Sequence, residues 1–378
     1  MKYDTLILHN GNEIDETTGA LSIPVYNAST FHQKDPSVRQ AYDYSRSGNP
    51  TRAAAEKTVA ALESGTHGFA FASGMAAISS TIMALFRPGD HLIVTRDIYG
   101  GAYRFFTTFA REFGIEISFA DLTNLASAES LVKPNTKGIY IESPTNPLLK
   151  IIDVEGTAAF AKKHDIISLI DNTFMSPVLM RPLELGIDVS IHSATKFLGG
   201  HSDLIAGVTV VKDDALAKKI YAAQNTLGAV LAPNDSWLLL RGIKTIGARM
   251  AAQNRGADTV ARRLQEIPWV SDVFYPGLET HPGHDVLARQ SSGFGAVLSF
   301  RTDTEERAKR IMAKVKLWTV AVSLGGVESI LSYPCVMSHG SVPKKERDEL
   351  GITETLLRLS VGLEDAEDLF EDIKQAGE

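Results

Sequence analysis

The feature that most constrains this chain is the alternation of helix-like and strand-like segments between residues 51 and 211. TRAAAEKTVAALES and GMAAISSTIMALF have helical patterns on either side of the strand-like HGFAFA. Six short apolar strands follow, separated by helical or looping stretches: HLIVT, IEISFA, KGIYIES, IISLID, DVSIHS and IAGVTVV. Parallel strands need crossover connections, so this pattern predicts an α/β fold with a mostly parallel sheet and helices on both faces.

The length of 378 residues predicts more than one domain, because single hydrophobic cores stop growing near ~250–300 residues. Residues 1–50 follow neither period and contain several Gly and Pro, which indicates an extended arm. A large domain is expected over 51–248, and a helical stretch from Asp235 to about Ile267 would connect it onward. Strands GAVLSF and LLRLSVG, mixed with helical segments, predict a smaller α+β domain over 249–378.

Charge and cysteine content narrow the classes of function. The net charge of −7, without a Lys/Arg block, argues against nucleic acid and favours a small-molecule ligand. Cys335 is the only cysteine, and neither a secretory signal nor a membrane-spanning apolar run is present, so we expect a cytoplasmic protein with no membrane partner. HPGH (281–284) has two histidines around a Pro-Gly turn, and we interpret it as a surface loop, not a metal site.

Two residues at predicted strand ends suggest a cofactor. Asp171 closes IISLID and Lys196 follows DVSIHSAT, and ligands of parallel sheets bind beyond the carboxyl ends of strands. A lysine and an aspartate in one crevice serve pyridoxal phosphate, since the lysine forms a Schiff base and the carboxylate keeps the pyridine nitrogen protonated. Burial or positive charge must then lower the lysine pKa from ~10.4. Taken singly, the two residues are better explained as a surface lysine and a turn-capping aspartate.

A phosphate-binding turn is predicted at ASGMAA, where Gly74 and Met75 open a helix. Unpaired amides and the helix dipole favour an anion at such an N-terminus. Ser193 and Thr195 offer additional hydroxyl donors next to Lys196. On its own, Ser-Gly before a helix is also an ordinary cap, so this signal counts only with the others.

Tyr99 and Arg358 complete the residues with distinctive surroundings. Tyr99 follows HLIVT and can stack on a flat cofactor, an interaction worth roughly 0.5–1.5 kcal/mol, or be a partly buried core tyrosine. Arg358 lies inside the apolar strand LLRLSVG, and a buried arginine needs an anionic partner. Its planar fork suits an amino-acid carboxylate, and a structural ion pair is the alternative.

Seven motifs, in order along nearly the whole chain, resemble those of the Cys/Met-metabolism enzymes that depend on pyridoxal phosphate, the cystathionine lyase and synthase group. They are YSRSGNPTR (44–52), ASGMAA (72–77), YGG (99–101), ESPTNP (142–147), DNTF (171–174), HSATKFLGGHSD (192–203) and LLRLSVGLED (356–365). The resemblance implies the aspartate aminotransferase-like fold, fold type I of pyridoxal phosphate enzymes. It would comprise an arm (1–50) that contacts a neighbouring subunit, a cofactor domain (51–248) and a C-terminal domain (249–378).

The resemblance also implies a role for each matching residue. Lys196, Tyr99 and Tyr44 would be catalytic, with Lys196 as the Schiff-base lysine that moves protons, Asp171 paired with the pyridine nitrogen and Tyr99 stacked on the ring. The phosphate would be held by Gly74, Met75, Ser193 and Thr195, and the substrate by Asn146, Ser323, Arg358 and Tyr44. Tyr44 and Arg46 would contact the cofactor phosphate of a neighbouring subunit, which implies an obligate homodimer, usually paired into a homotetramer.

The activity implied is a carbon–sulfur lyase that cleaves cystathionine by β-elimination to homocysteine, pyruvate and ammonia, in methionine biosynthesis. Family members that act at Cγ commonly carry a glutamate before the serine matching Ser323, and Val322 stands there instead. TFHQ, GTHGFAFASGMAAISS and ESILSYP are similar to the bacterial β-lyases of the family. The alternatives are a γ-lyase, then a γ-synthase or methionine γ-lyase, and, from another class, a non-catalytic nucleotide-binding α/β protein.

Overall fold

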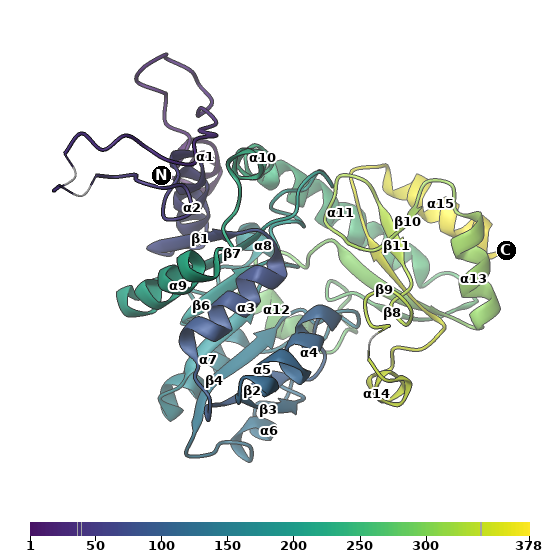
Figure 1. The fold of residues 1–378 in the computed structure, drawn as a ribbon. Helices are drawn as coiled ribbons and strands as arrows, with labels where there is room; N and C mark the ends of the chain where they lie inside the picture. The colour runs from purple at the N-terminus through teal and green to yellow at the C-terminus, as the bar shows by residue number, and fades with distance from the viewer. Residues whose placement is uncertain (36, 39, 341) are drawn as a thin grey trace.

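The chain forms two β-sheets, each with its own helices, and an N-terminal segment that protrudes from the body of the molecule (Figure 1). The computed structural model describes residues 1–35, 37–38, 40–340 and 342–378. Strands β1 to β7 lie within residues 67–211 and make the larger sheet, and β8 to β12 lie within residues 270–360 and make the smaller one. This arrangement confirms the predicted α/β architecture.

The larger sheet is parallel except at one strand. Its members are β1 (His67–Phe71), β2 (His91–Thr95), β3 (Glu116–Ala120), β4 (Thr136–Glu142), β5 (Ile167–Asp171), β6 (Val189–His192) and β7 (Gly207–Val211). Their order is β1-β7-β6-β5-β4-β2-β3, and only β7 runs antiparallel to its neighbours. Because β4, β5 and β6 are parallel neighbours, Glu142, Asp171 and His192 end at the same edge. This edge carries the site.

Helices cover both faces of the larger sheet, as its strands are apolar on both sides. The helices of this part are α2 (Pro50–Leu62), α3 (Gly74–Leu85), α4 (Gly100–Thr107), α5 (Phe109–Glu112), α6 (Ala126–Glu129), α7 (Val154–His164), α8 (Ser176–Leu179) and α9 (Asp214–Leu227). Ile82 of α3 belongs to the buried cluster of one face with Leu169, and Phe160 of α7 to that of the other face with Ile170. The sheet is therefore fixed from both sides.

The smaller sheet confirms the predicted C-terminal α+β region. Its strands are β8 (Val270–Phe274), β9 (Val297–Thr302), β10 (Thr319–Val320), β11 (Ile330–Ser332) and β12 (Leu356–Ser360), in the order β10-β11-β12-β9-β8. Helices α13 (Glu305–Lys314), α14 (Lys344–Leu350) and α15 (Ala366–Gly377) belong to this part, and α15 packs on α13 and α11. The domain boundary expected at residue 248 falls inside α11 (Ile246–Leu264), so that division stays a prediction.

Two expectations about helices are corrected. Residues 1–50 are not extended throughout, because α1 (Tyr3–His9) buries Ile7 and packs against α2 and α11. The stretch from Asp235 to Ile267 is two helices, α10 (Pro233–Ile243) and α11, since the chain leaves the helix between Ile243 and Ile246. An amphipathic pattern alone could not locate this break, because apolar residues continue across it.

The interpretation of the HPGH segment (281–284) as a surface loop is also corrected. The side chain of His281 is buried, and burial lowers its pKa to about 4. His284 begins α12 (His284–Gln290), and its Nδ1 lies 2.8 Å from the carbonyl oxygen of Pro276. The segment is thus a packed helix start and not a surface loop. Within the described part of the chain, no group of three or more His, Cys, Asp or Glu is arranged to hold a metal ion.

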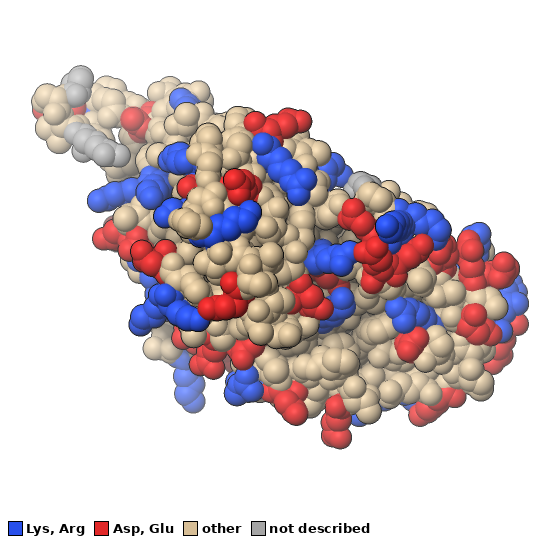
Figure 2. Space-filling model, turned by 90° about the horizontal axis from the view of Figure 1, so that it is seen from below, with Lys and Arg blue, Asp and Glu red and all other residues tan. Residues whose placement is uncertain are grey.

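The surface shows mixed charge. On the face in Figure 2, acidic and basic side chains are interspersed among neutral ones, and neither sign covers a large area. This distribution agrees with the absence of a basic block in the sequence. Among the helices of the described ranges, none combines the length and the apolar character that crossing a bilayer requires.

Candidate active site

A cavity of about 650 Å³ opens at the edge where β4, β5 and β6 end. Residues 322–324 and 336–340, from the part of the chain that carries the smaller sheet, form its other wall. Every site residue predicted from the sequence lines this cavity except Tyr44 and Arg46. Those that do are Gly74, Met75, Tyr99, Asn146, Asp171, Ser193, Thr195, Lys196, Ser323 and Arg358. The structure therefore brings together residues that are up to 284 positions apart in the chain.

Lys196 extends from the turn after β6 across the cavity. Its Nζ donates a hydrogen bond of 2.6 Å to Ser323 Oγ on the opposite wall. Burial and, to a smaller extent, the positive charge of Arg358 lower the pKa of Lys196 to about 8, and Asp171 partly opposes them. The sequence analysis required burial or a nearby positive charge for an active lysine, and both surround Lys196. At pH 7 about a tenth of the amine is then neutral and able to accept a proton.

Asp171 ends β5 and is held by the following turn. The backbone N–H of Thr173 donates to Asp171 Oδ1 at 3.0 Å, and the Thr173 hydroxyl donates to the same oxygen. Burial raises the pKa of Asp171, while the Thr173 bonds and the nearby His192 and Lys196 lower it. A cation placed against this carboxylate, such as a protonated ring nitrogen, would favour its charged form.

Glu142 also lines the cavity, although in the sequence it is distinguished only as the first residue of ESPTNP. It ends β4 in register with Asp171, lines the cavity, and accepts a 3.0 Å hydrogen bond from the backbone N–H of Tyr99 through Oε2. Burial and the neighbouring Asp171 raise the pKa of Glu142 well above its usual range. Its place at the carboxyl end of a parallel strand was the signal available in the sequence.

The start of α3, where the anion site is predicted, lies at the cavity. Ser73, Gly74 and Met75 line the cavity, and the Ser73 hydroxyl caps the helix by accepting from the N–H of Ala76 at 3.0 Å. A Cβ at Gly74 would come within 2.8 Å of Ser193 Oγ, so only glycine permits this approach. The Thr195 hydroxyl donates to the carbonyl oxygen of Ala206 at 3.1 Å and accepts from the N–H of the same residue at 2.9 Å, so its proton is already engaged by the backbone and the predicted role of Thr195 as a phosphate donor stays a prediction.

Tyr99 has an exposed ring in the cavity wall. Although its backbone is tied to Glu142, 41% of the residue is exposed, which excludes the alternative of a core tyrosine. A Cβ at Gly101 would lie 2.4 Å from the Tyr99 ring, so this glycine leaves room for the side chain. The arrangement offers a flat aromatic surface to a ligand.

Arg358 is buried on β12 without an acidic hydrogen-bond partner among the described residues. One terminal nitrogen donates to Asn146 Oδ1 at 2.8 Å and the other to the backbone oxygen of Ser323 at 2.8 Å, while Nε has no partner. Burial lowers its pKa to about 10. Among the described residues Arg358 forms no ion pair, which disfavours the structural alternative, and a buried guanidinium without an acidic partner is suited to an anionic ligand.

Ser323 holds this arrangement in an uncommon backbone conformation. Its φ of 89° lies in the left-handed region, which non-glycine residues rarely adopt. In this conformation Ser323 presents its hydroxyl to Lys196 and its carbonyl oxygen to Arg358. The strain is consistent with a functional position.

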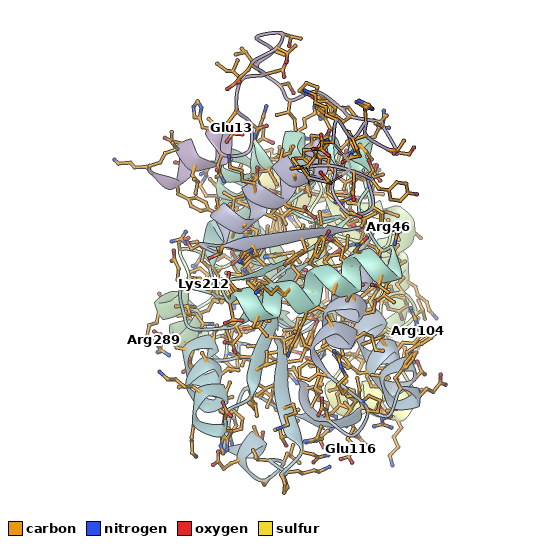
Figure 3. The ribbon with its side chains drawn as sticks, turned by 60° about the vertical axis from the view of Figure 1, so that its left-hand side comes forward. Glu13, Arg46, Arg104, Glu116, Lys212 and Arg289 are labelled. Atoms are coloured by element: carbon orange, nitrogen blue, oxygen red, sulfur yellow. The ribbon has the colours of Figure 1, made fainter. Side chains whose placement is uncertain are left out.

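Tyr44 and Arg46 lie outside the cavity of their own chain. Arg46 donates to the carbonyl oxygen of Asn225 in α9 at 2.9 Å and lies 5.5 Å from the centre of the Tyr44 ring. Figure 3 shows Arg46 near the end of α9, on the same side of the molecule as Arg104 and opposite Arg289. Tyr44 is 47% exposed. Both side chains are thus available at the surface.

The donor set fits pyridoxal phosphate. Helix α3 and Ser193 can hold its phosphate, Tyr99 can cover its ring, Asp171 can bind the ring nitrogen, and Lys196 can bond to its aldehyde carbon. The buried, half-satisfied Arg358 is left over for a second anion. The fold and these residues therefore define the class of pyridoxal-phosphate-dependent enzymes of α/β architecture.

Comparison with known proteins identifies the family. The family model "Cys/Met metabolism PLP-dependent enzyme" matches residues 4–378, and the chain belongs to this family. The chain is 51% identical to cystathionine beta-lyase MetC of Bacillus subtilis (strain 168), over 99% of this chain and 95% of that protein. It is 49% identical to cystathionine gamma-lyase of the same organism, over 100% and 99%.

Solved structures agree with this assignment. The crystal structure of cystathionine gamma-lyase from Lactobacillus plantarum complexed with L-serine is similar with a TM-score of 0.97 and 44% identity, covering 100% of this chain and 98% of that one. Cystathionine gamma synthase from Xanthomonas oryzae pv. oryzae, in complex with aminoacrylate and cysteine, is similar with a TM-score of 0.97 and 38% identity, covering 100% and 98%. The predicted fold type and cofactor are confirmed.

Proposed function

We propose that this protein is a carbon–sulfur lyase that cleaves L-cystathionine by β-elimination to homocysteine, pyruvate and ammonia. One observation carries the proposal: Lys196 and Arg358 both bond to Ser323, the first to its hydroxyl and the second to its carbonyl oxygen. An amino acid whose carboxylate binds Arg358 is therefore held within reach of the amine of Lys196. This pairing suits proton removal from the carbon that bears the carboxylate.

The side chains of the cavity have different roles in this reaction. Bound pyridoxal phosphate supplies an electron sink for the negative charge that proton loss leaves on the α-carbon. Lys196, with its pKa lowered to about 8, accepts that proton on Nζ. Asp171 provides negative charge for a protonated ring nitrogen, and Arg358 with Asn146 orients the carboxylate. The wall of Tyr99 excludes water from one side.

Val322 supports β- over γ-elimination. It lines the cavity beside Ser323 and is 63% exposed, so the side chain at this position faces the ligand space and not the core. A second deprotonation, at Cβ, is required for γ-chemistry, and an apolar side chain here provides no carboxylate to assist or to bind a distal amine. Three Lactococcus lactis relatives and one from Coxiella burnetii, 46–48% identical, are also cystathionine beta-lyases.

A γ-lyase is the second candidate, because relatives of that name occur at similar identity, 49% for Bacillus subtilis and 46% for human. The deciding experiment is a product assay on the purified protein with pyridoxal phosphate and L-cystathionine, in which keto acid and thiol are identified. Pyruvate with homocysteine supports the β-lyase. 2-Oxobutyrate with cysteine would contradict the argument from Val322. A colourless protein that does not bind the cofactor would favour the non-catalytic alternative.

We further propose that the active unit is a homodimer, in which Tyr44 and Arg46 of one chain complete the phosphate site of the other, and that dimers pair into a homotetramer. The support is that both residues are at the surface, outside the cavity of their own chain. Symmetric pairing would place each arm against its neighbour.

The single, buried Cys335 is compatible with the reducing cytoplasm that we expect for this enzyme.

Mixing two inactive variants tests the shared site. A dimer of one Lys196→Ala chain and one Arg46→Ala chain has one site with both lesions and one intact site if the arms are exchanged. Half of randomly mixed dimers are hybrids, so about a quarter of wild-type activity should return. Without exchange, every site carries one lesion and no activity returns.

A further inference from the structure

Glu142 and Asp171 form a buried pair of carboxyl groups at the edge of the larger sheet. They are register partners at the ends of β4 and β5, and 4% of Glu142 is exposed. Ionising both buried carboxyl groups is unfavourable, because the charge of Asp171 and the exclusion of water both raise the pKa of Glu142. We therefore expect one of the two to hold a proton.

The surroundings decide which one. Asp171 accepts two hydrogen bonds from Thr173, and both His192 and Lys196 lie close enough to favour its charge. Glu142 accepts a hydrogen bond from the backbone N–H of Tyr99. The backbone of Asn146 also lowers its pKa, but a second acid, Asp97, raises it. The negative charge is thus best placed on Asp171.

Two other ionisable groups face Glu142. Tyr140 lies on its own strand and is buried. Arg358, on β12, is the nearby cation, but its terminal nitrogens bond to Asn146 and Ser323 and not to Glu142. A carboxylate serving as counter-ion to Arg358 would be expected to accept one of those bonds.

We propose that Glu142 is a positioning residue which stays protonated and, through its bond to the Tyr99 amide, fixes the aromatic ring against the cofactor while Asp171 alone carries charge. The inference rests on the proposed function only in taking pyridoxal phosphate as the ligand of the cavity. A neutral acid in this place holds the Tyr99 loop without competing with Asp171 for the ring nitrogen. An ionised one would place a second negative charge at the cofactor.

Substitution of Glu142 by glutamine tests whether the carboxyl group is neutral or ionised. The glutamine amide keeps a hydrogen-bond acceptor and a donor, as a protonated carboxyl group does, and carries no charge. Glu142→Gln and Glu142→Ala should be compared with wild type by titrating the visible absorbance of the cofactor bound to Lys196, without substrate. We expect the Gln variant to keep the wild-type midpoint and cofactor affinity. The Ala variant, lacking the Tyr99 bond, should bind the cofactor roughly tenfold more weakly. Tyr140→Phe, on the same strand, is the matched control and should match wild type in both.

The contrary outcomes are equally distinct. If Glu142 is ionised, removing its charge in the Gln variant should lower the midpoint by on the order of one pH unit, since the cationic form of the Lys196 linkage would lose a stabilising charge. That result overturns the proposal, as does an Ala variant with unchanged cofactor affinity. Thermal unfolding of the cofactor-free forms shows whether each variant is folded. All of these readouts are independent of substrate, so failure of the β-lyase proposal leaves this test intact.

Discussion

The two walls of the cavity are built differently. The wall of the larger sheet comes from strand ends and a helix start: Asp171 is paired with a strand on each side, Glu142 pairs with Asp171, and the first turn of α3 is capped by the Ser73 hydroxyl. The opposite wall comes from irregular segments around Ser323 and residues 336–340. Two side-chain bonds join it to the first wall, one from Lys196 to Ser323 and one from Arg358 to Asn146. The regular wall suits a cofactor that stays, and the irregular wall suits substrates that differ between relatives.

The largest effect should come from Lys196, which spans both walls. Lys196→Ala removes the group that binds the cofactor and moves the proton, so kcat should fall by about 10³-fold or more. Pyruvate release and the visible absorbance of the bound cofactor measure it. Lys218→Ala, on the exposed side of α9, is the control and should behave as wild type. Substantial turnover by Lys196→Ala would contradict the assignment of Lys196 as the residue that binds the cofactor and moves the proton.

Arg358 tests the irregular wall. Arg358→Leu removes charge-assisted bonds to the substrate carboxylate, so kcat/KM should drop roughly 10–100-fold, mainly through KM. Because Arg358 helps to lower the pKa of Lys196, the midpoint of the Lys196 absorbance titration should also rise. Arg358→Lys keeps the positive charge but not the planar guanidinium group. The midpoint of the absorbance titration should therefore return closer to the wild-type value than KM does. Equal loss of cofactor affinity and substrate affinity would contradict the division of roles between the walls.

Val322 sharpens the comparison further. Val322→Glu adds a carboxylate to the substrate wall without touching the cofactor wall, and the ratio of 2-oxobutyrate to pyruvate from L-cystathionine should rise roughly tenfold. Val322→Gln, similar in size but uncharged, separates the effect of charge from that of volume. Cofactor affinity should not change in either variant. A product ratio insensitive to residue 322 would shift the choice of reaction to another part of the site.

The smallest effect concerns Asp97, behind the cofactor wall. It accepts a 3.0 Å hydrogen bond from Thr145, and burial raises its pKa to about 6 while Lys150 and Thr145 partly oppose this. The folded chain then binds more protons than the unfolded chain between pH ~4 and 6, so this group makes stability fall as pH rises through that range, by on the order of 1–3 kcal/mol. Asp97→Asn should flatten that part of the thermal-stability profile, whereas Asp203→Asn, which removes an exposed carboxyl group, should not.

The wall of the larger sheet could be predicted from the sequence because short stretches of sequence determine its strand ends and its helix start. Strand ends at Asp171 and Lys196 and the Gly74 turn are visible in short windows, and parallel pairing brings them to one edge. The role of Arg358 was predicted from its apolar surroundings, but its bonds to Asn146 and Ser323 join segments far apart in the chain. Glu142 was missed because one acid at a strand end has no distinctive neighbours in sequence, and its significance comes from its register with Asp171.

The arm and the helices between the sheets were predicted less well, for a related reason. The helix at Tyr3–His9 is short, and it is stabilised by packing of Ile7 in the core and not by a local pattern that could be recognised. The break between α10 and α11 has no Gly or Pro at residues 244 and 245 to mark it in the sequence. The partner that Tyr44 and Arg46 are proposed to reach lies on another chain, which no single sequence describes directly.

The bond between Lys196 and Ser323 has a mechanical consequence. This hydrogen bond connects the larger-sheet part of the chain to the smaller-sheet part. Its donor is the same nitrogen that would bond to the cofactor. When that nitrogen bonds to another group, its hydrogen bond to Ser323 is lost, whereas the bond from Arg358 to the Ser323 carbonyl oxygen lies within the smaller-sheet part of the chain and is unaffected. Any group that bonds to Lys196 Nζ therefore competes directly with this contact between the two walls.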